Sequence, residues 1–416
     1  MALDQTTFAA ALKTLYPSEV IKNLVYKNNP LFALIPKDES FYGDSSKEPI
    51  IIGTPQNRSA SFAGANVSTT NSAIRAFLIT RKTNYSMAAV ANETLEASQS
   101  DKGAFMKAVQ FEIDQALLAL TRALAIQMYR SGTGTVAQIA STATVNSSTT
   151  MVALAIPDQS TNLEIGMSIA LSATDGGAAR SGTAYIVSID RSTGSFLCSA
   201  TAGGAAAALT SLITGAAASD FIYQAAGDVN ATITGLTAWL KGSDITAGDS
   251  FYNVDRSVDK VRLGGIKVDG SALTIEAAIV QAATLAARES GRPDYVFMSF
   301  RDWNRLVAEL GAKVQFVDVN VAEAEVKASF SGLKINGPNG VMTVVPDQNC
   351  PAGVAFVLQL DTWKLKSLGE AVRLFNADGL TMIRDSSSDS LLVRSFSYAN
   401  VSCRAPGYNA RVILPA

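Results

Sequence analysis

A long amphipathic pattern is the strongest secondary-structure signal in this chain. Within residues 101–130, apolar side chains recur every three or four positions, at Phe105, Val109, Ile113, Leu117, Leu120, Leu124 and Met128. Leu118 and Ile126 widen this stripe, and Gly132 follows the segment. No proline and no glycine after Gly103 interrupts it. The spacing predicts one helix over residues 101–130, roughly 45 Å long at 1.5 Å per residue.

Two β-type patterns precede this helix. Residues 49–54 form a short apolar segment, and residues 74–90 begin with alternating apolar positions. The residues between them, 55–73, are rich in Ser, Asn, Thr and Gly and offer almost no apolar anchor. We therefore expect an extended hairpin loop over residues 38–90. Such a hairpin is marginal by itself and needs a partner surface.

The first 37 residues show two short helical patterns. Phe8, Leu12 and Leu15 have helical spacing, and a second apolar set occurs after Pro17. Proline ends or restarts a helix because it lacks the backbone donor. We predict an N-terminal arm over residues 1–37 that lies against a neighbouring surface. A short helical turn, capped by Asn92, is expected over residues 92–96.

The pattern changes after the long helix. Ala, Ser, Thr and Gly dominate residues 131–225, and charged side chains are sparse. Short β patterns recur at residues 151–156, 163–171 and 183–189, and residues 190–194 form a good hairpin turn. Strands at this spacing predict a small all-β sandwich or barrel, inserted over residues 133–225. The low charge argues against nucleic-acid binding by this segment.

Helices and strands alternate in the last part of the chain. We expect helices at residues 273–288 and 302–310 and a buried strand at residues 295–299. Residues 341–345 and 354–360 are expected to pair across a Pro/Asn/Gly-rich turn. Residues 390–403 and 412–414 are expected to return to one common sheet.

Composition limits the chemistry. Lys and Arg number 34 and Asp and Glu 36, giving a formal charge of −2, and histidine is absent. The absence of histidine excludes the Ser-His-Asp, Cys-His and HExxH mechanisms. The three cysteines are too few for a four-cysteine zinc site and fit a reducing cytosol. No basic excess points to sequence-specific DNA binding, and no apolar run is long enough to span a membrane.

Two local motifs have plain structural interpretations. Residues 132–137 fit the pattern G-x-G-x-x-A, but they follow a helix and do not open one. A dinucleotide site needs the reverse order, so we interpret the motif as a helix stop. Asp385 and Asp389 flank three serines and are interpreted as a solvated turn. We therefore predict no cofactor and no metal.

The order of these elements resembles the major capsid proteins of tailed double-stranded DNA bacteriophages, the Hong Kong 97-type fold. The resemblance is carried by the strand, short helix and strand pair of residues 292–366, and by the preceding arm, hairpin and long helix. It implies an α+β fold with the long helix as spine of a peripheral domain over residues 91–132. The implied peripheral domain continues over residues 226–290 and 379–416. The implied axial domain covers residues 291–378.

The resemblance also implies a function. The chain is expected to assemble into pentamers and hexamers of an icosahedral shell that encloses DNA without sequence-specific binding, in a virion assembled in the bacterial cytoplasm. It is expected not to be an enzyme. A separate scaffolding protein, a portal and a decoration protein are the implied partners. Candidate inter-subunit contacts are Arg58, Arg75, Arg81 and Lys82 in the hairpin and Glu323, Glu325 and Lys327 in the axial loop.

Two alternatives stay open. Encapsulin nanocompartments share this fold and package enzymes, although the long arm and the β insertion weigh against that interpretation. An unrelated enzyme without histidine would have to use carboxylate or lysine chemistry, and no such constellation is evident in the sequence.

Overall fold

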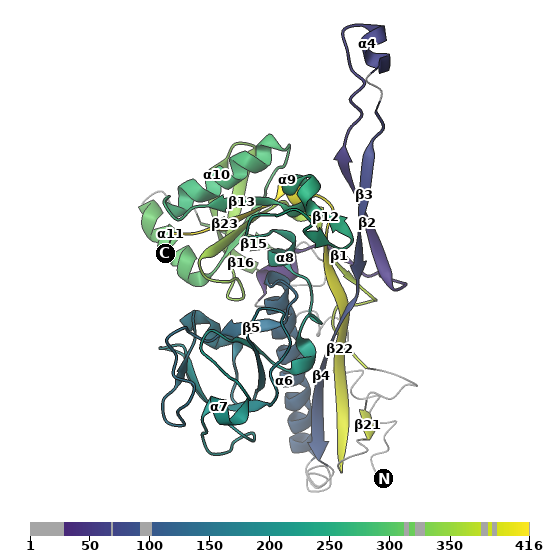
Figure 1. Ribbon diagram of the computed structural model, residues 1–416. Coiled ribbons are helices and arrows are strands. Elements are labelled where there is room, and N and C mark those ends of the chain that lie inside the picture. The colour runs from purple at the N-terminus through teal and green to yellow at the C-terminus, as the bar shows by residue number, and fades with distance from the viewer. Residues whose placement is uncertain are drawn as a thin grey trace.

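The computed structural model describes residues 29–67, 70–91, 102–311, 316–320, 329–375, 382–384 and 389–415. Within these residues the chain forms a body of two large sheets and a long helix, a separate six-stranded sheet beside that helix, and a hairpin that projects from the body (Figure 1). Most of the predicted arm and the predicted turn at residues 92–96 lie outside the described residues. The arm is represented by its end, helix α3 (Pro30–Leu34).

Helix α6 (Lys102–Tyr129) confirms the long helix. Five positions of the predicted stripe are buried in the main core: Ile113, Leu117, Leu120, Leu124 and Met128. Ile126 is buried as well, but Leu118 is 38% exposed. Gly132 follows with a φ of 86°, which only glycine adopts without strain. The next element is a strand, so the G-x-G-x-x-A segment does not open a helix.

A six-stranded sheet packs on α6. Its central strand is β22 (Ser390–Cys403), which pairs along one edge with β4 (Lys82–Ala91). Along the other edge it pairs with three short strands, and a further strand, β1 (Lys37–Asp38), pairs with the first of them. The three short strands are β19 (Trp363–Ser367), β20 (Arg373–Leu374) and β21 (Met382–Arg384). Val393, Ala399 and Val401 of β22 are buried in the main core that α6 also supplies.

The hairpin is shorter than the sequence pattern suggested. Strand β2 (Ser45–Gly53) pairs with β3 (Ala73–Thr80), and helix α4 (Phe62–Val67) lies at the far end (Figure 1). The expected second strand over residues 74–90 is not one hairpin strand. The chain leaves the hairpin at Arg81. Strand β4 then pairs with β22 in the six-stranded sheet, where its inward-facing residue Ala88 is buried.

A seven-stranded mixed sheet forms the second layer of the body, in the order β13-β23-β18-β14-β17-β16-β15. Helices α10 (Ile275–Arg288) and α11 (Phe300–Leu310) pack on one face, where the alanines of α10 allow close approach. Residues of the other face, such as Phe297 and Phe356, join the main core. The strands are β13 (Ile266–Asp269), β14 (Tyr295–Met298), β15 (Phe316–Asn320), β16 (Ser329–Gly337), β17 (Gly340–Pro346), β18 (Val354–Leu358) and β23 (Ala410–Ile413).

This sheet corrects two predictions. Strands β17 and β18 do not pair with each other, because β14 lies between them, parallel to β17 and antiparallel to β18. Val296, Phe297 and Met298 are buried on both faces, and such a strand belongs in the interior of a sheet. Strand β23 does not return to the sheet of β22 but pairs with β13 and β18. The domain bounds expected from sequence stay a prediction.

The charge-poor segment forms its own six-stranded sheet and its own core cluster, which includes Leu171, Ile186 and Phe196. The sheet order is β5-β10-β7-β8-β9-β6. The strands are β5 (Thr135–Gln138), β6 (Val152–Ala153), β7 (Ser168–Ser172), β8 (Ala184–Asp190), β9 (Ser195–Ser199) and β10 (Phe221–Tyr223). The predicted turn at residues 190–194 joins β8 to β9. We call this sheet with its connections the inserted β unit.

Shorter elements connect these layers. Between the inserted β unit and α10, helix α8 (Leu236–Trp239) is the most deeply buried, and strands β11 (Ser250–Phe251) and β12 (Val254–Asp255) form a small hairpin. The remaining short elements are α7 (Leu209–Leu212), α9 (Lys260–Gly264) and the 3-10 turns η1 (Pro157–Asn162), η2 (Ala226–Asp228), η3 (Arg256–Val258), η5 (Leu360–Thr362) and η6 (Pro406–Tyr408).

The chain returns from the inserted β unit at Gly235, directly against the end of α6. A Cβ atom at Gly235 would lie 2.1 Å from the carbonyl oxygen of Met128 and 2.4 Å from that of Gln127. We expect Gly235→Ala to lower the free energy of unfolding by about 1–3 kcal/mol, because backbone atoms must move apart. Thermal unfolding measures this. Gly227→Ala is the matched control, since its Cβ would meet no atom within 4 Å, and an equal loss in both variants would contradict the explanation.

Candidate assembly interface

The half of the hairpin next to the body is firmly anchored. Phe77 of β3 is fully buried and makes an edge contact with Trp239, with ring centroids 5.0 Å apart. The backbone N–H of Leu78 donates to the carbonyl of Tyr252 at 3.1 Å. The side-chain amide of Asn400, from β22, donates to the carbonyl of Thr80 at 2.7 Å. The base of the hairpin is therefore part of the body's core.

A buried ion pair also fixes this base. Lys366 of β19 pairs with Glu48 of β2 and donates from Nζ to Ser46 Oγ at 2.7 Å. The two charged side chains are only 11% and 15% exposed. Because both charged groups are largely removed from water, the attraction between them has to offset the desolvation cost of each.

Replacing one member of this ion pair is expected to lower the free energy of unfolding more than replacing both members. We expect Lys366→Met to lower the free energy of unfolding by about 3–5 kcal/mol, since Glu48 keeps a largely buried charge without a cation. The double variant Lys366→Met, Glu48→Leu should recover most of that loss because no charge is left buried. Urea unfolding of the unassembled subunit measures both. A double variant as unstable as the single one would refute this explanation.

Two predicted contact residues, Arg81 and Lys82, have partners within their own chain. Arg81 donates from Nη1 to the carbonyl of Phe41 at 2.9 Å and lies over that residue's ring at 5.5 Å. Lys82 donates from Nζ to the carbonyl of Asn230 at 2.8 Å, and burial lowers the pKa of Lys82. These contacts tie the hairpin base to the body. A role for either residue between subunits stays a prediction.

The far half of the hairpin has a different environment. Arg58 and Arg75 are exposed, and a role for either between subunits stays a prediction. Phe62 and Val67 of α4 are each 88% exposed, and the cross-strand pair Ile51 and Ile74 is also mostly exposed. Apolar side chains gathered on a projecting element are typical of a surface that a partner covers. The sequence prediction missed Phe62 and Val67, although they are the two large apolar residues in an otherwise polar segment.

A buried carboxylate joins the arm, the spine helix and the seven-stranded sheet. Asp347, in the turn after β17, accepts hydrogen bonds from Tyr129 Oη at 2.8 Å, from the Leu31 N–H at 3.3 Å and from the Asn349 N–H at 2.9 Å. Burial raises the pKa of Asp347, and these hydrogen bonds oppose the shift. No local sequence pattern indicates this junction, because its members are distant along the chain.

The remaining predicted contact residues, Glu323, Glu325 and Lys327, lie outside the described residues, as does Asp385.

Within the described part of the chain, no group of three or more Asp, Glu, His or Cys residues could hold a metal ion. No described helix is long and apolar enough to cross a membrane. Cys198, Cys350 and Cys403 are free and buried, and burial raises the pKa of Cys198 and of Cys403 to about 12.

Comparisons with known proteins give structural matches only. No protein-family model matches the sequence, and no curated protein matches it. The capsid of cyanophage A-1(L) is 12% identical and covers 97% of this chain and 99% of its own, with a TM-score of 0.52. A chain of Mycobacterium phage Bobi is 9% identical over 100% of both chains, with a TM-score of 0.43. The holo-SrpI encapsulin of Synechococcus elongatus is 8% identical over 97% of this chain and 94% of its own, with a TM-score of 0.43.

The match to the cyanophage capsid shows the fold. It extends over nearly the whole of both chains, so it includes the hairpin, the spine helix and both sheets of the body. The chain has a Hong Kong 97-type fold, and the α+β class predicted from sequence is confirmed.

Proposed function

We propose that this protein is the major capsid protein of a tailed bacteriophage, a structural subunit that assembles into an icosahedral shell around double-stranded DNA. The observation that carries the proposal is the correspondence of fold with the cyanophage capsid over 97% of this chain and 99% of that chain. A match of this extent leaves few residues for an additional catalytic domain. The protein would therefore act by packing against copies of itself and not by catalysis.

The projecting hairpin supports this proposal. Its base, as far as Ile50, is built into the core, yet Phe62 and Val67 near its tip are each 88% exposed. A two-stranded hairpin of this length is marginally stable in water unless it packs on another surface. A neighbouring subunit supplies that surface in a shell, through head-to-tail contacts that close into rings. Part of the subunit's stability would then depend on assembly.

The shell would be built from repeated copies of this fold. Pentamers and hexamers would form the shell, the inserted β unit would be a separate domain on it, and the near-neutral chain would enclose DNA without sequence-specific binding. A scaffolding protein and a portal would be separate partners. Assembly would take place in the bacterial cytoplasm and end in the virion.

Electron microscopy of the purified protein tests the proposal. We expect closed, uniform shells when the chain is expressed together with the other head proteins of its phage, and nuclease-protected DNA in particles from infected cells. Stable monomers under all assembly conditions would refute the shell function. Shells that enclose a cargo enzyme and no DNA would favour an encapsulin-type compartment instead.

A further inference from the structure

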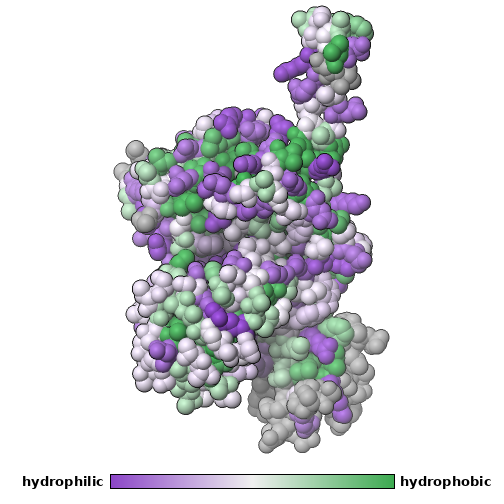
Figure 2. Space-filling view, viewed as in Figure 1, coloured by the Kyte–Doolittle hydropathy of each residue, from purple (hydrophilic) through white to green (hydrophobic). Residues whose placement is uncertain are grey.

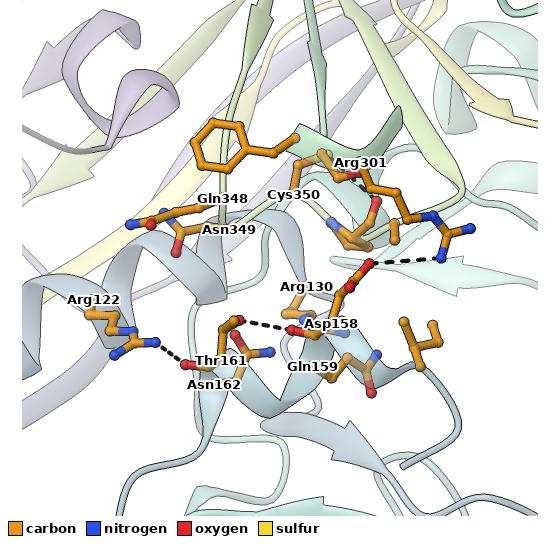
Figure 3. A pocket seen from close by; sticks show the side chains of 15 residues that line it. Arg122, Arg130, Asp158, Gln159, Thr161, Asn162, Arg301, Gln348, Asn349 and Cys350 are labelled. Carbon is orange, nitrogen blue, oxygen red and sulfur yellow. Dashed lines mark hydrogen bonds and ion pairs between the residues drawn. The ribbon is translucent and has the colours of Figure 1, made fainter. Parts of the chain in front are cut away.

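A cavity of about 260 Å³ lies where the inserted β unit meets the body (Figure 3). Its walls come from the spine helix α6, from the turn η1 of the inserted β unit, from the start of α11 and from the turn after β17. Figure 2 shows the crease between the inserted β unit and the rest of the body. The volume is near the lower end of the range for ligand pockets, so the cavity suits a small ligand.

The side chains that line this cavity carry a net positive charge. Arg122 comes from α6, Arg130 follows the last residue of α6, and Arg301 lies in the first turn of α11 (Figure 3). Asp158 of η1 is the one acidic residue among the described residues that line the cavity. An excess of positive charge in a recess with protein walls attracts anions.

The guanidinium group of Arg130 lacks a counter-ion within the described residues. Its Nη2 donates to the carbonyl of Val136 at 3.4 Å, and its buried Nε has no hydrogen-bond partner there. It forms no ion pair with the described part of the chain. Burial lowers the pKa of Arg130, and the negative charge of Asp175 opposes that shift without contact. A partly desolvated cation of this kind is stabilised by an anion placed beside it.

Arg301 and the start of α11 add further donors on the opposite wall. The ion pair of Arg301 with Asp158 is 3.8 Å long, beyond hydrogen-bond distance, and both side chains are about half exposed. The first backbone N–H groups of a helix have no partner within the helix and favour a negative charge. The acid of the same turn, Asp302, does not line the cavity and pairs with Arg305 at 3.6 Å. The donors of this wall are therefore available to an anion.

We propose that this cavity binds a phosphate group, held by Arg130, by Arg301 and by the start of α11. The planar guanidinium group of arginine suits this ligand because it donates two parallel hydrogen bonds to one oxyanion. Arg122 contributes less, since it already pairs with Glu164 and donates to the carbonyl of Thr161. A phosphate group between η1 and α11 would fix the inserted β unit on the body. The inference goes beyond the proposed shell function and does not depend on it.

Calorimetric titration of the purified full-length subunit with inorganic phosphate tests this site, with sodium chloride at equal ionic strength as the blank. We expect saturable binding at a single site. We also expect the temperature of thermal unfolding to rise with phosphate concentration, because a ligand that binds only the folded state stabilises it. Heats equal to those of the blank, together with an unchanged unfolding temperature, would overturn the proposal. Since the test uses unassembled subunits, that result would leave the shell function intact.

Two substitutions locate the phosphate in this cavity. Arg130→Met and Arg301→Gln should each weaken its binding by about tenfold or more, since each removes hydrogen bonds from a charged donor. Arg288→Gln is the matched control, because Arg288 is also an exposed arginine with a 3.8 Å ion pair but does not line the cavity. Equal losses in the control and the two variants would overturn the assignment. If Arg130→Met does not fold, Arg301→Gln decides the result alone.

Removing the competing carboxylate should have the opposite effect. We expect Asp158→Asn to tighten phosphate binding by roughly two- to fivefold, because it frees Arg301 and removes a repulsive charge from the cavity. A purely structural role for the arginines predicts no such gain. Unchanged or weaker binding by a folded Asp158→Asn subunit, as judged by circular dichroism, would show that phosphate does not bind here.

The phosphate group has two possible sources, a free ion or a small phosphomonoester. Titration with glycerol 3-phosphate distinguishes them. Tighter binding of inorganic phosphate would support the site and assign a free ion to it, and tighter binding of glycerol 3-phosphate would support it and assign a phosphomonoester. Binding of both ligands that is unaffected by Arg301→Gln would overturn the site.

Discussion

Replacing Trp239 with alanine is expected to lower the free energy of unfolding by about 3–5 kcal/mol. Trp239 ends helix α8 and is fully buried. Its ring contacts Phe77 of the hairpin base at 5.0 Å, Phe251 at 5.0 Å and Trp363 of β19 at 6.3 Å between centroids. Its Nε1 also donates to the carbonyl of Val401 at 3.2 Å. Alanine would leave a cavity where the hairpin, α8 and the six-stranded sheet meet.

Urea unfolding of the unassembled subunit, followed by circular dichroism, measures this loss. Trp239→Phe is the informative control, because it keeps an aromatic ring among the same neighbours but removes the indole donor. We expect a smaller loss for phenylalanine than for alanine. An alanine variant that loses less than about 1 kcal/mol, the average for an ordinary substitution, would contradict a central role for this side chain.

Aspartate at the hairpin tip is expected to abolish shell assembly without unfolding the subunit. Phe62 and Val67 are both 88% exposed, so Phe62→Asp, Val67→Asp should change the subunit's free energy of unfolding by no more than about 0.5 kcal/mol. In a shell, both positions would be covered by a neighbour. A charge placed there would be buried without a partner, and repetition at every subunit contact would multiply the cost.

Sedimentation and negative-stain microscopy give the particle yield, and thermal unfolding reports the subunit's own stability. Val258→Asp is the matched control, because Val258 is also a mostly exposed valine but lies in η3 and not in the hairpin. We expect normal particles from the control and none from the tip variant. Normal particles from the tip variant would show that the hairpin tip has no role in assembly.

Local patterns explain which parts of the fold could be predicted. The stripe from Ile113 to Met128 repeats with helical spacing, so α6 follows from the sequence within a residue or two at each end. Helix α10 begins at Ile275 because Thr274 caps it, accepting a hydrogen bond from the Ala277 N–H at 3.2 Å. Such signals depend on neighbours within a few positions.

Pairing between distant strands explains the errors. The pattern of residues 74–90 is continuous, but Arg81 divides it between two sheets. Likewise, β17 and β18 are close in sequence, yet β14 separates them in space. Alternation of apolar and polar residues within one strand indicates which face is buried, but it does not indicate which strand pairs with it.

The candidate site shows the same division. Arg58 and Arg75 could be proposed from sequence, because a hairpin with a polar end exposes its charges. The partners of Arg81 and Lys82 could not be proposed from sequence. Phe41 lies 40 positions from Arg81, and Asn230 lies 148 positions from Lys82.

The sequence by itself determined the spine helix, the hairpin, the charge-poor β segment and the order that resembles a capsid subunit, because each depends on periodicity and composition along the chain. Only the tertiary structure decided that β14 separates β17 from β18, that Asp347 joins three elements, and that Arg130 and Arg301 line one cavity. These features depend on contacts between residues up to several hundred positions apart, and the free energy of such contacts is set by burial and geometry that no local pattern contains.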